Sequence, residues 1–238
     1  MSERVIQILK SAGHVVAYYT ATLLSGTFFR CFMRVRITGR GHLPSKGPFL
    51  VVANHISHFD PPLLASALRR KVAWVVALDM YAHPIGAAYF NAIESIPVDR
   101  KQTDMKAPRA ILKRFQRGDI VGLFPEGGIR AGASSVLGGA PLDEAVAALA
   151  RLGKVPVVPC VILGADKLYA WRAWLWRTTI DIRFGRPMTV EGKSSTTARE
   201  QATLQIPEAM RKLVGELRSE FSLGEDDLPK TPQERWRA

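Results

Sequence analysis

Cysteine is scarce in this chain: Cys31 and Cys160 are the only two among 238 residues. Both lie in or beside apolar runs, with no Cys-x-x-Cys spacing and no histidine cluster nearby. The sequence therefore predicts neither a disulfide framework nor a zinc site, and it favours a reducing cytoplasm as the compartment.

Several cofactor and partner motifs are also missing. The sequence contains no Gly-x-Gly-x-x-Gly dinucleotide motif, no phosphate-binding P-loop and no cluster of metal-ligand residues, so we predict no bound cofactor and no metal. It lacks a block of Lys and Arg with interleaved aromatic residues, which nucleic-acid-binding modules have, so we expect no nucleic-acid partner.

Acidic residues are too few to balance the basic ones. The 33 Lys and Arg residues against 21 Asp and Glu give a formal net charge of +12, which implies anionic partners such as a phosphorylated substrate or an anionic lipid surface. An apolar fraction of 47% is too low for a polytopic membrane protein and suits one domain with a substantial core.

The N-terminal segment, residues 1–36, contains a long uncharged run. No charged side chain lies between Lys10 and Arg30, but polar residues interrupt the run, and basic residues flank it on both sides. Three interpretations compete: an interfacial or monotopic anchor helix, a single transmembrane span, and a helix packed on the domain. The basic flanks favour a membrane-associating helix at an anionic surface, and we expect this surface to be the cytoplasmic face of the membrane. No small-x-small cleavage site follows the apolar run, so a cleaved signal peptide is not expected.

Strand and helix patterns alternate over residues 37–223. This alternation predicts an α/β domain with a mostly parallel central sheet flanked by helices. We expect strands over 49–53, 72–78, 93–98, 120–124, 155–163 and 178–184, the last half-exposed at an edge, and helices over 61–70, 83–91, 105–117, 142–152 and 197–221. Pro207 is expected to break the last helix, and the polar tail over 224–238 is expected to be frayed.

The segment Asn54-His55-Ile56-Ser57-His58-Phe59-Asp60 carries the strongest chemical signal. His55 follows a predicted strand at its carboxyl end, where open α/β sheets bind ligands. Asp60, before Pro61, is expected to cap the next helix and to lie close enough to hold the imidazole. A histidine held by a carboxylate on one nitrogen can take a proton on the other. The alternative is a hydrogen-bonded turn in which Asp60 only caps the helix.

Three further motifs follow in order: Ile96-Pro97-Val98-Asp99-Arg100, Phe124-Pro125-Glu126-Gly127 and Val155-Pro156-Val157-Val158-Pro159. Together with the His-x-x-x-x-Asp segment, this series resembles the glycerolipid acyltransferase family, typified by 1-acyl-sn-glycerol-3-phosphate acyltransferase. The resemblance runs from about residue 39 to residue 187. Each motif alone is weak, whereas four in series at these intervals form a strong signal.

The resemblance implies roles for the matched residues. His55 would be the general base and Asp60 the carboxylate that orients it. Arg100 would clamp the phosphate of the acceptor, with a surface ion pair to Asp99 as the alternative. His58, inside the first motif but not at a matched position, is expected to be a spacer.

The third and first motifs supply the other candidate substrate-binding residues. Glu126 and Gly127 would bind or position the glycerol part of the acceptor. The chain departs from the commonest pattern here, because Gly128-Ile129-Arg130 replaces the usual Thr-Arg, and Arg130 is expected to act one residue later. Asn54 is counted with these residues, with a structural role in the turn as its alternative.

The resemblance further implies acyl transfer from acyl-CoA or acyl carrier protein to the free hydroxyl of 1-acyl-sn-glycerol 3-phosphate. The rival interpretations are another lysolipid acceptor, a thioesterase and a non-catalytic binder of anionic lipid. Trp and Arg residues mixed over 169–177 suit either a membrane-interface belt or tryptophans packed against a helix.

Overall fold

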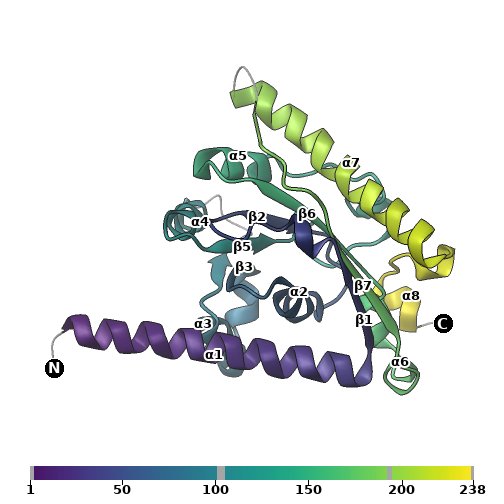
Figure 1. Cartoon of the computed structure of the whole chain (residues 1–238), viewed down its shortest axis with the longest axis horizontal. Helices are drawn as coiled ribbons and strands as arrows, with labels where there is room; N and C mark the ends of the chain where they lie inside the picture. Colours follow the sequence, from purple (N-terminus) through teal and green to yellow (C-terminus); the bar gives the residue numbers. More distant parts are fainter. Residues whose placement is uncertain (1–2, 101–104, 192–194, 237–238) are drawn as a thin grey trace.

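The computed structural model describes residues 3–100, 105–191 and 195–236. Within these residues the strands form one seven-stranded sheet, shown in Figure 1. Its order is β1 (Arg34–Thr38), β7 (Thr179–Phe184), β6 (Val157–Leu163), β2 (Leu50–Ala53), β5 (Ile120–Leu123), β3 (Val72–Ala77) and β4 (Ile96–Val98). Among these strands, β6 and β7 pair antiparallel and the other neighbours pair parallel, which confirms the predicted α/β fold with a mostly parallel sheet.

Helices cover both faces of the sheet (Figure 1). One layer contains α1 (Glu3–Phe32), α2 (Asp60–Leu68) and α3 (Pro84–Ala92), and the other contains α4 (Lys106–Gln116), α5 (Glu144–Gly153) and α7 (Ser195–Phe221). Along β2, Val51 and Ala53 belong to the core of the first layer, whereas Leu50 and Val52 belong to that of the second. Burial on both faces explains why the central strands read as continuous apolar runs in the sequence.

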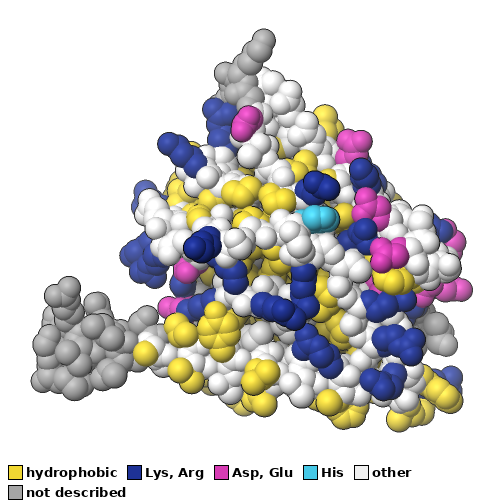
Figure 2. All heavy atoms as spheres, in the orientation of Figure 1, with side chains coloured by type: hydrophobic (Ala, Val, Ile, Leu, Met, Phe, Trp, Pro, Cys, Tyr) yellow, Lys and Arg dark blue, Asp and Glu magenta, His cyan; other side chains and the backbone are white. Residues whose placement is uncertain are grey.

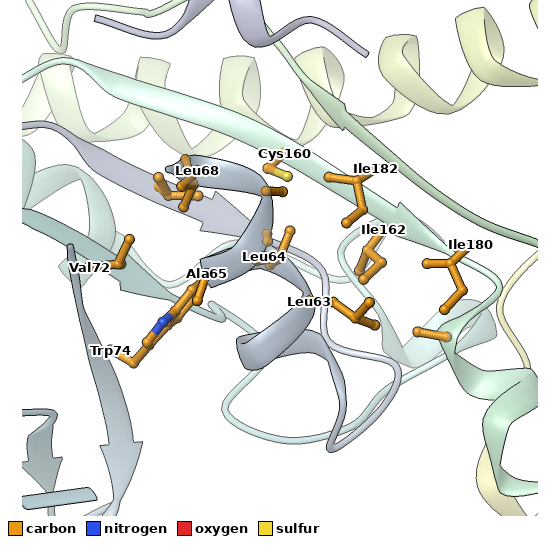
Figure 3. Close-up of a cluster of buried hydrophobic side chains, with 14 of the residues drawn as sticks. Leu63, Leu64, Ala65, Leu68, Val72, Trp74, Cys160, Ile162, Ile180 and Ile182 are labelled. Atoms are coloured by element: carbon orange, nitrogen blue, oxygen red, sulfur yellow. The ribbon is translucent and has the colours of Figure 1, made fainter. Parts of the chain in front are cut away.

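The short helix α2 is fixed by its buried leucines. Leu63, Leu64 and Leu68 lie in the same buried cluster as Ile162 of β6 and Ile182 of β7, as Figure 3 shows. Each buried leucine contributes about 1.5–3 kcal/mol of transfer free energy. Because α2 is fixed in this way, the loop between β2 and α2, which holds the His-x-x-x-x-Asp motif, has both of its ends anchored in the core.

Strand β1 is absent from the sequence prediction, and β7 was wrongly expected at an edge. In the structure β7 lies between β1 and β6, and most of its residues are buried. Its buried Asp181 accepts two hydrogen bonds from Arg36 of β1, at 2.5 and 2.7 Å. The Arg36 side chain also lies 3.8 Å from the centre of the Phe221 ring. This pairing gives the charge of Asp181 the partner that a buried carboxylate needs.

The break expected at Pro207 is also wrong, because α7 continues through it. A proline inside a helix removes one hydrogen bond and costs about 3 kcal/mol. Ala202 and Ile206 before the proline, and Met210 and Leu213 after it, are all buried in the same core cluster. Packing on both sides of Pro207 therefore holds the two halves in one helix.

The tail that was expected to be frayed folds back onto the domain as far as it is described, to residue 236. It contains η5 (Glu225–Asp227) and α8 (Pro232–Trp236), which lie against η4 (Ala165–Tyr169). The buried carboxylate of Asp166 accepts hydrogen bonds from the backbone N–H of Lys230 at 3.0 Å and from Nε of Arg235 at 2.6 Å. These bonds tie the end of the chain to a loop far earlier in the sequence.

Helix α1 packs on the domain through one face only. Tyr18, Phe29 and Met33, just after the helix, are buried, and the Tyr18 hydroxyl accepts a hydrogen bond from the backbone N–H of Val72 at 3.1 Å. Burial raises the pKa of Tyr18 to about 12. The opposite face remains exposed. A single span was one interpretation of this segment; in the described part of the chain, no helix combines the length and apolarity needed to cross a bilayer.

Candidate active site

The first motif brings an imidazole and a carboxylate into contact. Nδ1 of His55 lies 2.9 Å from Oδ2 of Asp60, and the same oxygen accepts the backbone N–H groups of Ile56 and Ser57 at 2.7 and 2.8 Å. Asp60 is completely buried, which raises the pKa of its carboxyl, while the bond from His55 and the two backbone bonds oppose that effect. These three bonds fix the carboxylate relative to the ring.

Asp60 does not cap its own helix, contrary to the prediction. Phe59 occupies the N-cap position of α2, and Asp60 is the first residue of the helix, with prolines at the next two positions. Its side chain turns back toward the loop instead of toward the N–H groups of α2. The geometry of Asp60 therefore fits the role of orienting the imidazole better than the role of capping the helix.

Aromatic rings hold the other side of His55. Its ring stacks on Phe124 with centroids 4.2 Å apart, and Phe124 stacks on Trp74 at 5.4 Å. Gly122 leaves room for this stack, because a Cβ atom there would come within 2.5 Å of the Trp74 ring. Since Asp60 occupies Nδ1, Nε2 is the nitrogen of His55 that remains for a substrate.

Glu126 supports the backbone of His55. Its Oε2 accepts the His55 backbone N–H at 2.8 Å, and its Oε1 accepts the Val136 N–H at 2.9 Å. Burial raises the pKa of the Glu126 carboxyl, and these two bonds oppose the rise. The backbone N–H of Arg130 donates to the His55 carbonyl at 2.9 Å. Glu126 and Arg130 thus bond the backbone N–H and the backbone carbonyl of His55, respectively.

The structure gives Glu126 of the third motif and Arg130 just after it contacts other than the predicted ones. Both carboxylate oxygens of Glu126 bond backbone N–H groups, so this side chain positions the first motif. Ile129 lines the neighbouring cavity, and Arg130 is not among the lining residues. Arg130 contacts His55 through its backbone N–H, whereas the prediction assigned a substrate contact to its side chain.

Asn54 has the structural role that was its alternative. Its side-chain amide donates to the carbonyl of Ile162 and accepts the N–H of the same residue, both at 2.9 Å. With an exposed fraction of 1%, it cannot contact a substrate. The contacts of Asn54 therefore match its structural alternative and not substrate binding: the residue links the end of β2 to β6.

Arg100 and Gly127 meet at the entrance of the site. Arg100 follows β4 as predicted, and its guanidinium donates a hydrogen bond to the carbonyl of Gly127. Gly127 has a φ of 62°, a left-handed conformation that glycine adopts without strain. Both residues line the same cavity as His55, with Arg100 in an exposed position.

The cavity has a volume of about 390 Å³. Its polar lining includes His55, His58 and Arg100. The remaining wall is mostly apolar and comes from α1, α2, β3 and α3, with contributions from Tyr18, Ala21, Pro61, Ala65, Trp74, Val76 and Phe90. The sequence prediction did not include the wall from α1, which is formed by residues of the inner helix face. Among the described residues, no group of three or more His, Cys, Asp or Glu side chains could hold a metal ion.

A family model described as Acyltransferase matches residues 34–163, more than half of the chain. The chain belongs to the acyltransferase family. The match begins with β1 and ends with β6, so it includes all four motifs noted in the sequence. The resemblance to that family is thus confirmed, and three of the residues that it assigned to the reaction, His55, Arg100 and Gly127, line one cavity.

Two known proteins are similar to this chain. A 1-acyl-sn-glycerol-3-phosphate acyltransferase from Bacillus subtilis (strain 168) is 23% identical over 131 residues, which cover 55% of this chain and 63% of the relative. The crystal structure of the 1-acyl-sn-glycerophosphate (LPA) acyltransferase PlsC from Thermotoga maritima superposes with a TM-score of 0.67 at 20% identity. That superposition covers 85% of this chain and 80% of the other, and it shows a shared fold.

Proposed function

We propose that this family member transfers an acyl group from a thioester, on coenzyme A or acyl carrier protein, to the free hydroxyl of 1-acyl-sn-glycerol 3-phosphate, giving phosphatidic acid. The observation that carries the proposal is the His55–Asp60 pair, with 2.9 Å between Nδ1 and Oδ2, beside an apolar cavity of about 390 Å³. The similarity to the 1-acyl-sn-glycerol-3-phosphate acyltransferase of Bacillus subtilis supports this acceptor.

The reaction needs a base and no covalent enzyme intermediate. Nε2 of His55 takes the proton of the acceptor hydroxyl, and Asp60 stabilises the imidazolium that forms. The acceptor oxygen attacks the thioester carbonyl carbon, the new C–O ester bond forms, and the C–S bond breaks. The proton held by His55 then goes to the thiolate that leaves. In this scheme Arg100 binds the acceptor phosphate, and the apolar wall holds acyl chains.

A transfer assay tests the proposal on the full-length protein. Purified protein receives labelled 1-acylglycerol 3-phosphate with acyl-CoA or acyl carrier protein as the donor, and a panel of other lysolipids runs in parallel. We expect labelled phosphatidic acid. Free fatty acid without a diacyl product would favour a thioesterase, transfer only to another lysolipid would change the acceptor, and binding without turnover would favour a non-catalytic lipid binder.

Glu126 gives a prediction that separates positioning from acceptor binding. In Glu126→Gln, the amide N–H₂ faces one of the two backbone N–H donors, so one buried donor loses its acceptor at a cost of about 1–3 kcal/mol. We expect kcat to fall about tenfold or more, with the acceptor KM nearly unchanged in steady-state assays. An increased acceptor KM at constant kcat would mean that Glu126 contacts the acceptor.

An anionic bilayer is the proposed docking surface, on the cytoplasmic side of the membrane. The outer face of α1 exposes Val16, Leu23 and Leu24 at 65–70%, and near α6 (Arg172–Leu175) Trp171 and Trp176 are 69% and 81% exposed. Figure 2 shows hydrophobic side chains along the lower edge of the molecule, where α1 lies in Figure 1.

The two apolar elements form one surface that cations border. Phe28 of α1 and Trp174 of α6 lie with ring centroids 5.7 Å apart. The exposed Arg177 donates to the backbone carbonyl of Arg30, the residue two positions after Phe28, at 3.3 Å, and the Arg30 side chain is also exposed. Apolar side chains with bordering arginines suit an interface of acyl chains and anionic headgroups.

A vesicle assay measures this docking. The triple variant Leu23→Ser, Leu24→Ser, Trp176→Ser is expected to lower partitioning onto phosphatidylglycerol-containing vesicles about tenfold or more, because each buried apolar side chain contributes about 1.5–3 kcal/mol. The matched control is Leu204→Ser, on α7, where the leucine is 71% exposed. Co-sedimentation of the triple variant equal to the wild type would contradict the assigned surface.

A further inference from the structure

The loop that carries His55 holds a second imidazole that the reaction scheme above does not use. His58 lines the same cavity. Its Nδ1 lies 2.6 Å from the hydroxyl of Tyr169, and its backbone N–H donates to the same hydroxyl at 3.2 Å. Tyr169 lies 111 positions later in the chain, at the end of η4, so this contact is a tertiary one.

The two histidines have chemically different partners. Asp60 is a carboxylate and only accepts, so Nδ1 of His55 carries the proton and Nε2 presents a lone pair. The Tyr169 hydroxyl accepts the backbone N–H of His58 and has one proton of its own, which it can donate to Nδ1 of His58. His58 then carries its proton on Nε2. Burial and the neighbouring His55 lower the pKa of His58, which favours the neutral ring.

We propose that His58 binds an anionic oxygen of the substrate through its Nε2–H, and that Tyr169 is the positioning residue that fixes this tautomer. The proposal rests on the acyl transfer proposed above. Two substrate oxygens have the required chemistry: the phosphate of the acceptor, and the oxyanion that forms on the thioester carbonyl during attack. One loop would then supply a base at His55 and a hydrogen-bond donor at His58.

The C-terminal segment supports Tyr169 in this role. Asp166, three residues before Tyr169, bonds Lys230 and Arg235 of the tail, and the ring of Trp236 lies edge-on to Tyr169 with centroids 5.9 Å apart. These contacts hold η4 and therefore the hydroxyl that His58 contacts. The position of Tyr169 thus depends on residues that lie well beyond the four motifs.

Two substitutions at His58 test the donor. In His58→Gln, the side-chain amide can place an N–H near the position of Nε2, whereas His58→Asn is too short to do so. We expect His58→Asn to lower kcat/KM about 10- to 100-fold and His58→Gln to retain most of it. A loss in kcat would assign the thioester oxyanion, and an increased KM for 1-acylglycerol 3-phosphate would assign the phosphate. Wild-type kcat/KM in both variants would overturn the proposal.

A spectroscopic measurement tests the tautomer without turnover. In ¹⁵N-labelled wild-type protein at neutral pH, two-bond ¹H–¹⁵N correlations should show His58 protonated on Nε2 only, and Tyr169→Phe should give a mixture of tautomers. A proton on Nδ1, or an imidazolium, in the wild type would overturn the proposal. Wild-type protein that shows the Nε2–H tautomer but no acyl transfer would contradict the proposed function and leave the assignment of Tyr169 standing.

Discussion

Replacing His55 with alanine is expected to lower kcat for acyl transfer by about 10²- to 10⁴-fold, the range that a positioned general base contributes. The side chain packs on Phe124 and is partly exposed, so the fold should survive its removal. Steady-state transfer with labelled 1-acylglycerol 3-phosphate gives the rate, and a thermal melt checks folding. Wild-type turnover in a folded His55→Ala protein would contradict the role of His55 as the base.

Asp60→Asn is the matched variant, because it keeps the hydrogen bonds and removes the charge. Oδ2 of Asp60 accepts the bonds from His55, Ile56 and Ser57, and in the described structure Oδ1 is buried without a partner. The amide oxygen can therefore take the place of Oδ2, with the amide nitrogen at the other position. We expect a loss smaller than that of His55→Ala, since the base remains but its imidazolium is less stabilised. A loss as large as that of His55→Ala would mean that the charge is indispensable.

Removing Arg235 is expected to have the largest effect on stability. Arg235→Gln takes away the charged partner of Asp166, whose side chain is 0% exposed, and leaves that carboxylate with only the backbone N–H of Lys230. Breaking a buried ion pair from one side costs about 3–5 kcal/mol. Because Arg235 itself is slightly exposed, we expect a loss of about 3 kcal/mol in the free energy of unfolding, measured by urea denaturation.

Two further variants control this measurement. Lys230→Ala removes an exposed ion pair with Asp226 but keeps the backbone N–H that bonds Asp166, so it should cost less than about 1 kcal/mol. Adding Asp166→Asn to Arg235→Gln removes the buried carboxylate charge that has lost its partner, and it should recover part of the lost free energy of unfolding. Equal stability of Arg235→Gln and Lys230→Ala would contradict a structural role for the pair.

The elements that the sequence predicts well are those whose signal is local. The strand before His55 and the helix after Asp60 show apolar runs, prolines and a turn within a few residues, and the His55–Asp60 contact spans only five positions. Strand β1 is different, because two of its five residues are arginines. It pairs in parallel with β7, where Arg36 meets Asp181, a partner that no local pattern reveals.

The same reasoning applies to the contacts at the site. Asn54 is a linker because Ile162 lies beside it, 108 positions away in sequence. Glu126 was expected to contact the acceptor, but its role depends on two backbone N–H groups whose directions only the folded loop sets. The charged tail was expected to be frayed because its partner Asp166 lies far earlier in the sequence. Sequence motifs identified which residues matter, and tertiary contacts decided what each of them touches.

The position of β1 has a consequence for synthesis on the ribosome. Its neighbour in the sheet is β7, and the paired residues Arg36 and Asp181 are 145 positions apart. At roughly 5–20 residues per second, translation needs roughly 7–30 s to cover that distance. Until β7 emerges, the nascent β1 has no strand to pair with, and an unpaired edge invites association with other chains. We expect the newly made chain to need chaperone protection during that interval.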